Sequence, residues 1–344
     1  MDGIFAGAIE QIKKGRKFLV VSHVNPEGDA VGSLLGLALA LKNAGKDVTP
    51  YLEDPLPDVF RFLPGAELVV HDLAGKGPFD ATFAVDCGQK ERLGKGFCGL
   101  KEPGVVINVD HHATNDRFGG INIIVPDASA AGELVFDLCK EAGLRITRDV
   151  AVNLYVAIHT DTGSFRYSSS TPGSFIKAGE LVKLGADPWD ISMRVYENYP
   201  AKRYKLLGMV LSTLEVIDVP CGGAKCDIAK VVVTLEMLRK TGAEKDLADG
   251  FVNYARGIEG VEIGVLFREC ASNEYKVSFR SKGDIDVASV AEGFGGGGHS
   301  HAAGCNIKGS LKEVEDTVLE TLKARIRESM AVANPRAKVK REGC

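Results

Sequence analysis

The chain has 344 residues, which is enough for two domains that each bury a hydrophobic core. Hydrophobic residues make up 45% and charged residues 26% of the chain, a composition typical of folded globular proteins and not of disordered ones. The formal net charge of −4 gives no general attraction for long duplex nucleic acid, so any nucleic-acid partner should be small or bind a local basic cluster.

The N-terminal residues lack a positively charged segment followed by an apolar one, so we expect no signal peptide. The longest apolar stretch of the first half, residues 34–41, is too short to cross a bilayer. The eight cysteines are scattered, which favours reduced thiols. Together these features predict a cytoplasmic protein with no membrane partner.

The first half of the chain alternates short β-branched runs with helical stretches, which predicts an α/β fold with a parallel sheet. The expected strands are residues 18–23, 48–52, 81–86, 105–110 and 121–125. The expected helices are residues 29–44, 131–142, 148–159 and 173–184. We assign residues 1–185 to this N-terminal domain.

The second half predicts a smaller α/β domain at residues 225–332, joined to the first by a linker and helix at residues 186–224. Its expected strands are residues 228–235, 261–268 and 274–280, and its expected helices are residues 245–256, 287–292 and 311–330. The glycine run at 295–298 receives no strand. The basic tail, residues 333–344, is expected to fray.

Acidic and histidine side chains gather at the predicted carboxyl ends of the strands and at the helix ends beside them. These residues are His23, Glu27, Asp29, Asp86, Asp110, His111, His112 and Asp161. In open α/β sheets, ligands bind outside the carboxyl ends of the strands, so we expect these side chains to converge on one crevice.

So many carboxylates would repel one another unless cations lay among them. Mixed histidine and carboxylate ligands suit Mn²⁺, with Mg²⁺, Co²⁺ or Fe²⁺ as competitors. Two ions bridged by one carboxylate would activate a water molecule and neutralise charge on a phosphoryl group. Each residue alone would be an ordinary strand-end polar residue or helix cap, but the set in this order favours a metal centre.

Four segments resemble the successive motifs of the DHH phosphoesterase superfamily: SHVNPEGDAVGS (22–33), VDCG (85–88), NVDHH (108–112) and HTDTGSFRYSSS (159–170). The segment FRSKGDIDVASVAEGFGGGGHSHAAG (279–304) resembles the DHH-associated C-terminal domain with its GGGH signature. The size and the second domain are similar to the NrnA-type (RecJ-like) oligoribonucleases. Family-II pyrophosphatases carry a different C-terminal domain, and RecJ exonucleases usually carry extra domains.

The resemblance implies the ligands of each metal. One ion would be held by His23, Glu27 and Asp86. The other would be held by Asp29, Asp86, His111 and Asp161, with Asp86 as the bridge. The catalytic residues would be Asp86, His112, which faces the phosphate or its leaving group, and Asp110, which orients the histidine pair. Glu27 departs from the family, which more often has Asp at this position.

A second group of residues is expected to bind the substrate. Glycines let backbone N–H groups approach an anion, and arginine offers a planar fork to phosphate oxygens. We therefore predict substrate contacts from Arg280, Ser281, Gly296, Gly297, Gly298 and His299. Arg166 is predicted to reach a phosphate from the metal side, with a structural ion pair as the alternative. We expect the substrate in a cleft between the domains.

The predicted function is metal-dependent hydrolysis of very short oligonucleotides, by exonucleolytic release of mononucleotides, and of 3′-phosphoadenosine-5′-phosphate (pAp). One alternative is a linear or cyclic dinucleotide phosphodiesterase of signalling, acting on pApA, pGpG or cyclic di-AMP. Another is a nucleotide sensor without catalysis. The predicted partner is a short oligonucleotide or nucleotide substrate. The sequence leaves the oligomeric state open, with a homodimer as one alternative.

Overall fold

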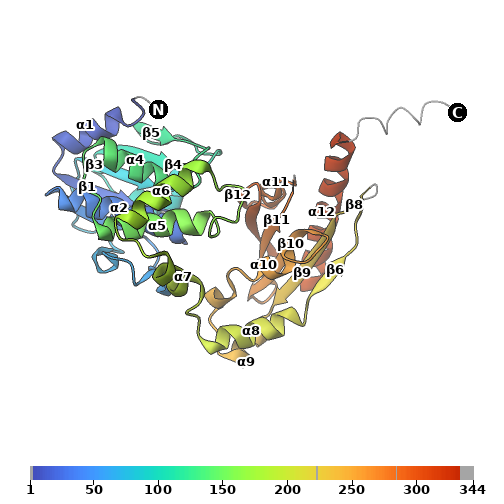
Figure 1. The fold of residues 1–344 in the computed structure, drawn as a ribbon. Coiled ribbons are helices and arrows are strands. Elements are labelled where there is room, and N and C mark those ends of the chain that lie inside the picture. The colour runs from blue at the N-terminus through green and yellow to red at the C-terminus, as the bar shows by residue number, and fades with distance from the viewer. Residues whose placement is uncertain (1–2, 222–223, 284, 334–344) are drawn as a thin grey trace, which may run out of the picture. The chain divides into compact units, whose positions relative to one another are not determined.

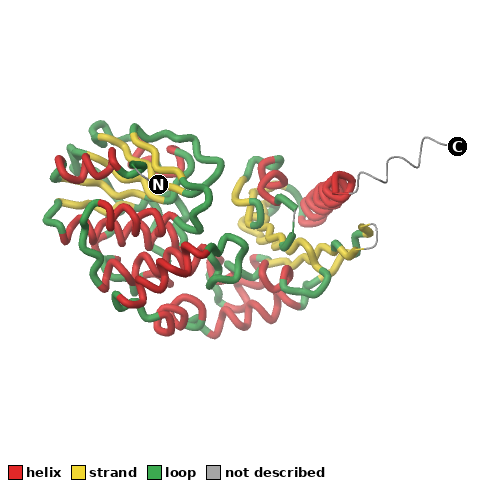
Figure 2. The backbone as a smooth tube through the Cα atoms, turned by 45° about the horizontal axis from the view of Figure 1, so that its top comes forward, coloured by secondary structure: helices red, strands yellow, loops and turns green. Residues whose placement is uncertain are grey.

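The chain folds into two compact units, Met1–Asn198 and Tyr199–Cys344, in a computed structural model that describes residues 3–221, 224–283 and 285–333. Figures 1 and 2 show the sheet and the helices of each unit. Within the described part of the chain, no helix combines the length and the apolar character needed to cross a membrane. Residues 334–344 of the predicted basic tail lie outside the described residues.

The first unit contains a five-stranded parallel sheet in the order β2-β1-β3-β4-β5. Its strands are β1 (Lys17–Val21), β2 (Asp47–Tyr51), β3 (Ala81–Val85), β4 (Val105–Asp110) and β5 (Ile121–Ile124). Each overlaps a strand expected from the sequence. The predicted parallel α/β architecture of the N-terminal half is therefore confirmed.

The central strands β1 and β3 are buried almost throughout, which explains why they read as nearly continuous apolar runs rather than alternating with polar residues. On one face, Phe18 and Phe83 pack with residues of the helices α1 (Ala6–Lys14), α2 (Gly28–Asn43), α4 (Ala131–Glu141) and α5 (Arg148–Asp161). On the other face, Leu19, Val21 and Phe97 belong to a smaller hydrophobic cluster. The remaining helices of the unit are α3 (Lys95–Cys98), α6 (Pro172–Lys183) and α7 (Pro188–Tyr196).

A stripe of glycines on α2 brings this helix unusually close to α5. Gly28, Gly32 and Gly36 recur every fourth residue, so they lie on one face of α2. A Cβ atom on Gly32 would lie 2.4 Å from the carbonyl oxygen of Asn153, and one on Gly28 would lie 2.3 Å from Thr160 Oγ1. Because Gly28 opens α2 and Thr160 is at the end of α5, this packing joins the two helix ends that carry acidic residues.

The second unit contains a six-stranded sheet in the order β12-β13-β11-β10-β9-β6. Its strands are β6 (Glu215–Ile217), β9 (Asp227–Val233), β10 (Val261–Ala271), β11 (Glu274–Ser281), β12 (Gly297–His299) and β13 (Ala302–Lys308). Only β9 and β10 run parallel; the other pairs are antiparallel. The predicted second α/β domain is confirmed, and its sheet is mixed.

Two hydrophobic clusters cover the faces of this second sheet. The helices α11 (Val287–Glu292) and α12 (Leu311–Ala333) contribute to one cluster, and α8 (Ala201–Leu211) and α10 (Val252–Arg256) contribute to the other. The described part of this unit also contains a short helix, α9 (Leu235–Thr241), a 3-10 helix at Lys245–Ala248, and a small hairpin of β7 (Pro220–Cys221) and β8 (Ala224–Lys225).

The end of the glycine run belongs to an edge strand where the sequence predicted none. Gly297 and Gly298 belong to β12 and pair with Gly304 and Ala303 of β13. A Cβ atom on Gly298 would lie 2.4 Å from the carbonyl oxygen of Ala302. Glycine disfavours strands by its own propensity, but here the close approach of two backbones requires it, so tertiary packing overrides the propensity.

Several helices differ from the sequence prediction. The structure adds α1 at the N-terminus and α7 within the predicted linker, and also the short helices α3 and α9. Helix α7 begins with Asp187, whose carboxylate accepts hydrogen bonds from the backbone N–H groups of Trp189 and Asp190, and with a proline at its first position. The single helix predicted at 245–256 is broken, because Gly250 adopts a left-handed φ of 82° before α10 begins.

The cysteines follow the prediction of reduced thiols only in part. Five of them are free thiols: Cys87, Cys98, Cys139, Cys270 and Cys305. Cys226 is disulfide-bonded, so the prediction is wrong at this position.

Because of the glycine stripe, two matched Gly→Ala substitutions should change the free energy of unfolding in opposite directions. Gly32→Ala should lower the free energy of unfolding by about 1–3 kcal/mol, because the added methyl group forces α2 away from α5. Gly179→Ala is the control, since this helical glycine of α6 has no atom within 4 Å of an added Cβ. Alanine should stabilise that position by roughly 0.5–1 kcal/mol. Urea unfolding measures both, and equal stability of the two variants would contradict the close-packing account.

Candidate metal centre

The loop between β1 and α2 brings the side chains of His23 and Glu27 close together. His23 Nδ1 lies 2.8 Å from the carbonyl oxygen of Val24 and donates its proton there. Because Nδ1 faces this carbonyl oxygen, Nε2 is the ring nitrogen that would face a metal ion. His23 Nε2 lies 3.7 Å from Glu27 Oε1. Glu27 caps α2, and its carboxylate accepts hydrogen bonds from the backbone N–H groups of Asp29 and Ala30.

Two residues that the sequence did not predict hold this loop. Asn25 has a left-handed φ of 55°, and its N–H donates to Asp54 Oδ2 at 2.6 Å. The Arg92 carbonyl oxygen accepts a hydrogen bond from the Val24 N–H at 2.7 Å, and Arg92 Nη2 lies 3.2 Å from His23 Nδ1. Asp54 follows the carboxyl end of β2. The rule that functional residues lie at the carboxyl ends of parallel strands would have found it, had it been applied to that strand.

Asp86 follows β3 and lies at the centre of the site. It is buried, with a left-handed φ of 52°. Its Oδ2 lies 3.5 Å from His23 Nε2, and its Oδ1 lies 3.6 Å from His111 Nε2. The two oxygens of one carboxylate therefore face two different imidazoles.

These distances are too long for hydrogen bonds and suit atoms that share an ion. Oδ1 of Asp86 accepts no hydrogen bond from any residue that the structure describes. A buried oxygen that accepts no hydrogen bond lowers the stability of a folded protein. Two ligand atoms that each lie about 2.1 Å from a cation are separated by roughly 3.0–3.5 Å, close to the separations at Asp86. The residues present therefore fit a metal ion.

The pKa values of the buried carboxylates shift in opposite directions. Burial alone would raise the pKa of Asp86, but the imidazoles of His111 and His23 outweigh it and hold this pKa well below its usual range. Burial, together with the charge of Asp86, raises the pKa of Asp29 well above its usual range, and burial raises the pKa of Asp161 to about 7. A divalent cation would thus displace protons from this cluster when it binds.

His111 forms a second group with two carboxylates. Its Nε2 lies 3.7 Å from Asp29 Oδ2 and 3.5 Å from Asp161 Oδ2. Its Nδ1 donates to the carbonyl oxygen of Ala128 at 3.1 Å. The carboxylate of Asp29 accepts hydrogen bonds from the Ser33 hydroxyl and from two backbone N–H groups at the start of α4.

Asp110 and His112 form a hydrogen-bonded pair beside these groups. Asp110 Oδ1 accepts from His112 Nδ1 at 2.7 Å, and Asp110 Oδ2 accepts from Asn115 Nδ2 at 2.6 Å. Burial lowers the pKa of His112, but the carboxylates of Asp110 and Asp86 outweigh it and raise this pKa. Asp110 thus contacts His112, whereas the Ala128 carbonyl is the partner of His111.

The structure brings together all eight residues that the sequence placed in one crevice. Their potential ligand atoms form three groups, within each of which all atoms lie within 4.8 Å of one another. These groups are His23, Glu27 and Asp86; Asp29, His111 and Asp161; and Asp86, Asp110, His111 and His112. Each of these acidic and histidine clusters could hold a metal ion.

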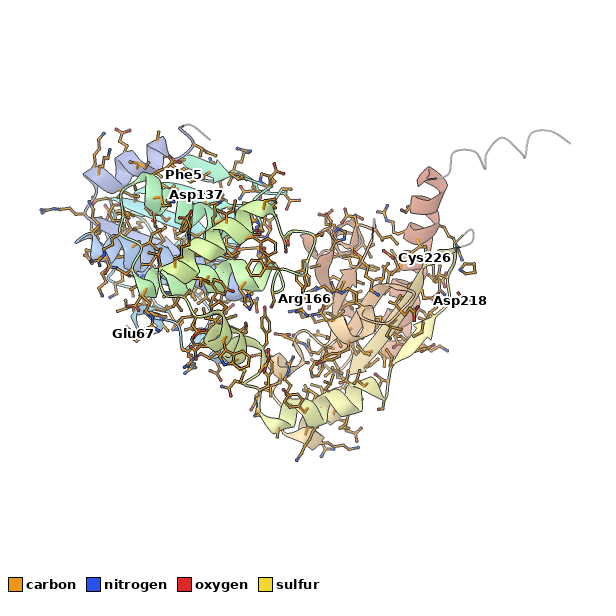
Figure 3. All side chains as sticks on the ribbon, in the orientation of Figure 1. Phe5, Glu67, Asp137, Arg166, Asp218 and Cys226 are labelled. Atoms are coloured by element: carbon orange, nitrogen blue, oxygen red, sulfur yellow. The ribbon has the colours of Figure 1, made fainter. Side chains whose placement is uncertain are left out.

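Arg166 lies in a strained turn just after Asp161 (Figure 3). Gly163, Ser164 and Phe165 have successive left-handed φ values of 55°, 60° and 60°. Arg166 Nε donates to the Gly163 carbonyl oxygen at 2.7 Å, so this side chain supports the turn. Such strain commonly persists at functional sites because the surrounding structure holds it.

The predicted substrate-binding residues lie in one corner of the second sheet. Arg280 of β11 and His299 of β12 both pair with Ala302 of β13, so their backbones share one row. Ser281 is buried, and its hydroxyl lies 2.9 Å from the Ile285 carbonyl oxygen, to which it donates, and 3.0 Å from His301 Nδ1. Gly296 precedes β12, which contains Gly297 and Gly298. The His299 side chain lies outside the described part of the structure.

Comparison with known proteins identifies the family. The DHH family N-terminal domain matches residues 17–158, and the DHHA1 domain matches residues 228–328. The bifunctional oligoribonuclease and PAP phosphatase NrnA of Thermus thermophilus is 35% identical over 305 residues, which cover 88% of each chain. The chain belongs to the NrnA-type DHH phosphoesterases.

Further relatives agree with this membership. The bifunctional oligoribonuclease and PAP phosphatase NrnA of Bacillus subtilis is 26% identical over 292 residues, 83% of this chain and 87% of that protein. The crystal structure of an exopolyphosphatase-related protein from Bacteroides fragilis is 28% identical and covers 96% of this chain and 98% of that chain, with a TM-score of 0.85. The two-domain DHH fold is therefore confirmed along the chain.

The metal centre predicts a stability change on metal binding. Mn²⁺ at about 100 times its dissociation constant should raise the free energy of unfolding of metal-free protein by about 2.7 kcal/mol per site. Asp86→Asn should lose at least half of the total gain, and Asn tolerates the left-handed φ. Asp190→Ala, which removes only an exposed ion pair with Arg194, is the control and should keep the gain. Thermal or urea unfolding checks this, and an undiminished gain in Asp86→Asn would contradict the role of Asp86.

Proposed function

We propose that this protein uses two divalent metal ions to hydrolyse very short oligonucleotides, releasing mononucleotides, and also pAp. The observation that carries the proposal is the arrangement at Asp86, whose two oxygens face His23 and His111 at 3.5 and 3.6 Å. A carboxylate with this arrangement suits a bridge between two ions in a phosphoester hydrolase. The substrates follow from relatives named as oligoribonucleases and PAP phosphatases.

The proposed ligand sets divide the site at Asp86. His23, Glu27 and Asp86 hold one ion, and Asp29, Asp86, His111 and Asp161 hold the other. Mn²⁺ is the proposed ion because the ligands mix imidazole nitrogen with carboxylate oxygen, and Mg²⁺ or Co²⁺ are the competitors. When bound, the ions lower the pKa of a coordinated water molecule and neutralise charge on the phosphoryl group.

The Asp110–His112 pair supplies proton transfer in this proposal. Because His112 Nδ1 donates to Asp110 at 2.7 Å, proton exchange with a leaving oxygen takes place at Nε2. The Asp110 carboxylate stabilises the charged imidazolium and keeps the ring oriented, and Asn115 in turn holds Asp110. His112 is thus proposed as the general acid, with Asp110 as its orienting partner.

The second unit is proposed to bind the substrate through one corner of its sheet. Arg280, Ser281, Gly296, Gly297, Gly298 and His299 are the proposed substrate-binding residues. The guanidinium of Arg280 offers a planar donor to a phosphate, and the backbone of the glycine strand is open at Gly297, where an added Cβ would meet no atom within 4 Å. Arg166 is proposed to contact a phosphate from the metal side. The cytoplasmic location, the homodimer and the interdomain cleft stay predictions.

A substrate panel tests the function. Purified protein with Mn²⁺ should release mononucleotides from a dinucleotide and phosphate from pAp, and should act slowly on a 24-mer, on cyclic di-AMP and on pyrophosphate. Preferred turnover of cyclic di-AMP would favour the signalling phosphodiesterase instead. Binding of nucleotides without turnover under any metal would favour the sensor and contradict the proposal.

Removal of the Arg280 guanidinium should selectively weaken the binding of short substrates. A charge-assisted hydrogen bond to phosphate contributes about 1.5–3 kcal/mol, so Arg280→Ala should lower kcat/KM for a dinucleotide roughly ten- to hundredfold, mainly through KM. Lys308→Ala is the control, because this exposed lysine of β13 pairs only with Glu274 among the described ion pairs. Unchanged kinetics of Arg280→Ala on the dinucleotide, or equal rates of the wild type on the dinucleotide and a 24-mer, would refute the predicted grip.

A further inference from the structure

The short segment 128–132 contacts two of the proposed metal ligands at once. The Ala128 carbonyl oxygen accepts the proton of His111 Nδ1 at 3.1 Å. The backbone N–H groups of Ala131 and Gly132, in the first turn of α4, donate to the Asp29 carboxylate at 2.6 and 3.0 Å. A displacement of this segment would therefore shift His111 and Asp29 together.

Glu133 fixes the segment from within. Its Oε1 accepts from the Ser129 N–H at 3.1 Å and also from the Ser129 hydroxyl. Its Oε2 accepts from Lys177 Nζ of α6 at 2.9 Å. The Glu133 side chain is only 3% exposed, so its charge requires a cation at close range.

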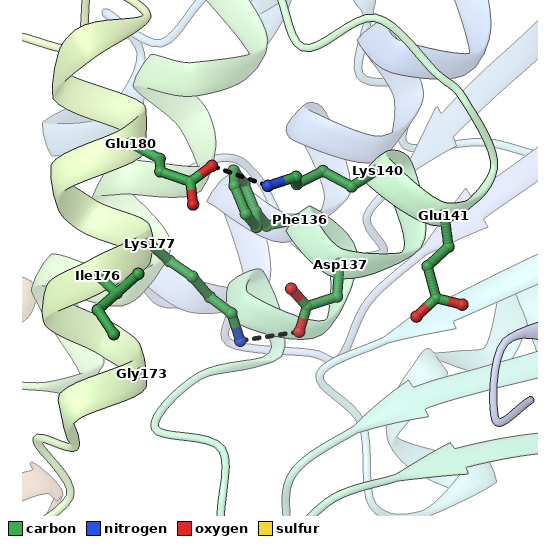
Figure 4. A pocket seen from close by; sticks show the side chains of 8 residues that line it. All are labelled: Phe136, Asp137, Lys140, Glu141, Gly173, Ile176, Lys177 and Glu180. Atoms are coloured by element: carbon green, nitrogen blue, oxygen red, sulfur yellow. Dashed lines mark hydrogen bonds and ion pairs between the residues drawn. The ribbon is translucent and has the colours of Figure 1, made fainter. Parts of the chain in front are cut away.

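Lys177 provides that cation from a largely buried position. Its side chain is 15% exposed, and its Nζ also lies 2.8 Å from Asp137 Oδ2, the ion pair drawn in Figure 4. Lys177 therefore neutralises two carboxylates of α4, those of Glu133 and Asp137, and its removal would leave both without this positive charge. A buried carboxylate that loses its cation gains by turning toward water, so the contacts of Glu133 with Ser129 would weaken.

We propose that Lys177 is a positioning residue for the metal centre: its ion pair with Glu133 holds residues 128–132 and thereby sets the affinity for the ion bound by Asp29, His111 and Asp161. This inference rests on the proposed function, because it assumes that these three residues bind a metal. Groups that orient metal ligands commonly change metal affinity ten- to hundredfold when removed.

A second ion pair between the same helices offers a matched control. Lys140 of α4 and Glu180 of α6 lie 2.9 Å apart, with side chains 53% and 40% exposed. Figure 4 shows this pair beside the Lys177–Asp137 pair, across the same hollow between α4 and α6. An exposed pair of this kind contributes little to stability, and it lies outside the chain of contacts from Lys177 to Ser129.

The hollow also allows a conservative rescue. It has a volume of about 490 Å³ and is lined by residues of both helices, among them Phe136, Gly173 and Ile176. This space beside Lys177 can take the larger guanidinium of arginine, which keeps the positive charge near Glu133. Lys177→Arg should therefore preserve the ion pair.

Mn²⁺ binding to the metal-free full-length protein tests the proposal directly. In calorimetry, Lys177→Met should bind one of the two ions about ten- to hundredfold more weakly, whereas Lys140→Met and Lys177→Arg should bind as the wild type does. Hydrogen exchange of the Ala131 and Gly132 amides, measured without metal, should be faster in Lys177→Met alone.

The outcomes separate this inference from the proposed function. Wild-type protein that binds no Mn²⁺ would overturn the proposed function itself. Wild-type binding of two ions with unchanged affinity in Lys177→Met, or an equal loss in Lys140→Met, would overturn only the positioning role. Should Lys177→Met fail to fold, Glu133→Gln carries the same comparison, because it removes the charge at nearly constant volume and should weaken the same ion.

Discussion

The proposed metal centre of the first unit depends on a buried carboxylate whose two oxygens face different imidazoles. Asp86 is almost fully buried, and one of its oxygens accepts no hydrogen bond from the described residues. In a core, such a group is tolerable only beside positive charge. The surrounding elements provide His23 on one side and His111 on the other, and a pair of divalent ions would complete the compensation.

The fold delivers these side chains through simple rules of packing. Parallel strands end at the same edge of the sheet, which brings His23, Asp86 and His111 together from three strands. The glycine stripe of α2 then lets α5 approach until Asp29 and Asp161 meet the same imidazole. The first turn of α4 donates two backbone N–H groups to Asp29, so backbone groups as well as side chains define the site.

The fold class and the acidic cluster could be predicted from the sequence because both follow local patterns. Apolar runs ending in Asp or His specify a strand and its functional edge together. The contacts of Ala128 and Lys177 could not be predicted, because one is a backbone carbonyl and the other joins two helices distant in sequence. Strand β12 was missed for a related reason: its glycines serve close packing that only the folded sheet reveals.

The positioning residues extend the site well beyond its proposed ligands. Asp54 and Arg92 hold the loop that carries His23, and Ser129, Glu133 and Lys177 hold the segment behind His111 and Asp29. Each proposed ion is therefore supported by a separate set of contacts, so one half of the site can be weakened without the other.

The most direct test of the central claim is the number of Mn²⁺ ions bound per chain, measured together with dinucleotide turnover. We expect two ions and turnover in the wild type, and in Asp86→Asn at most one tightly bound ion and loss of turnover. Two tightly bound ions or wild-type turnover in Asp86→Asn would contradict the bridging role of Asp86.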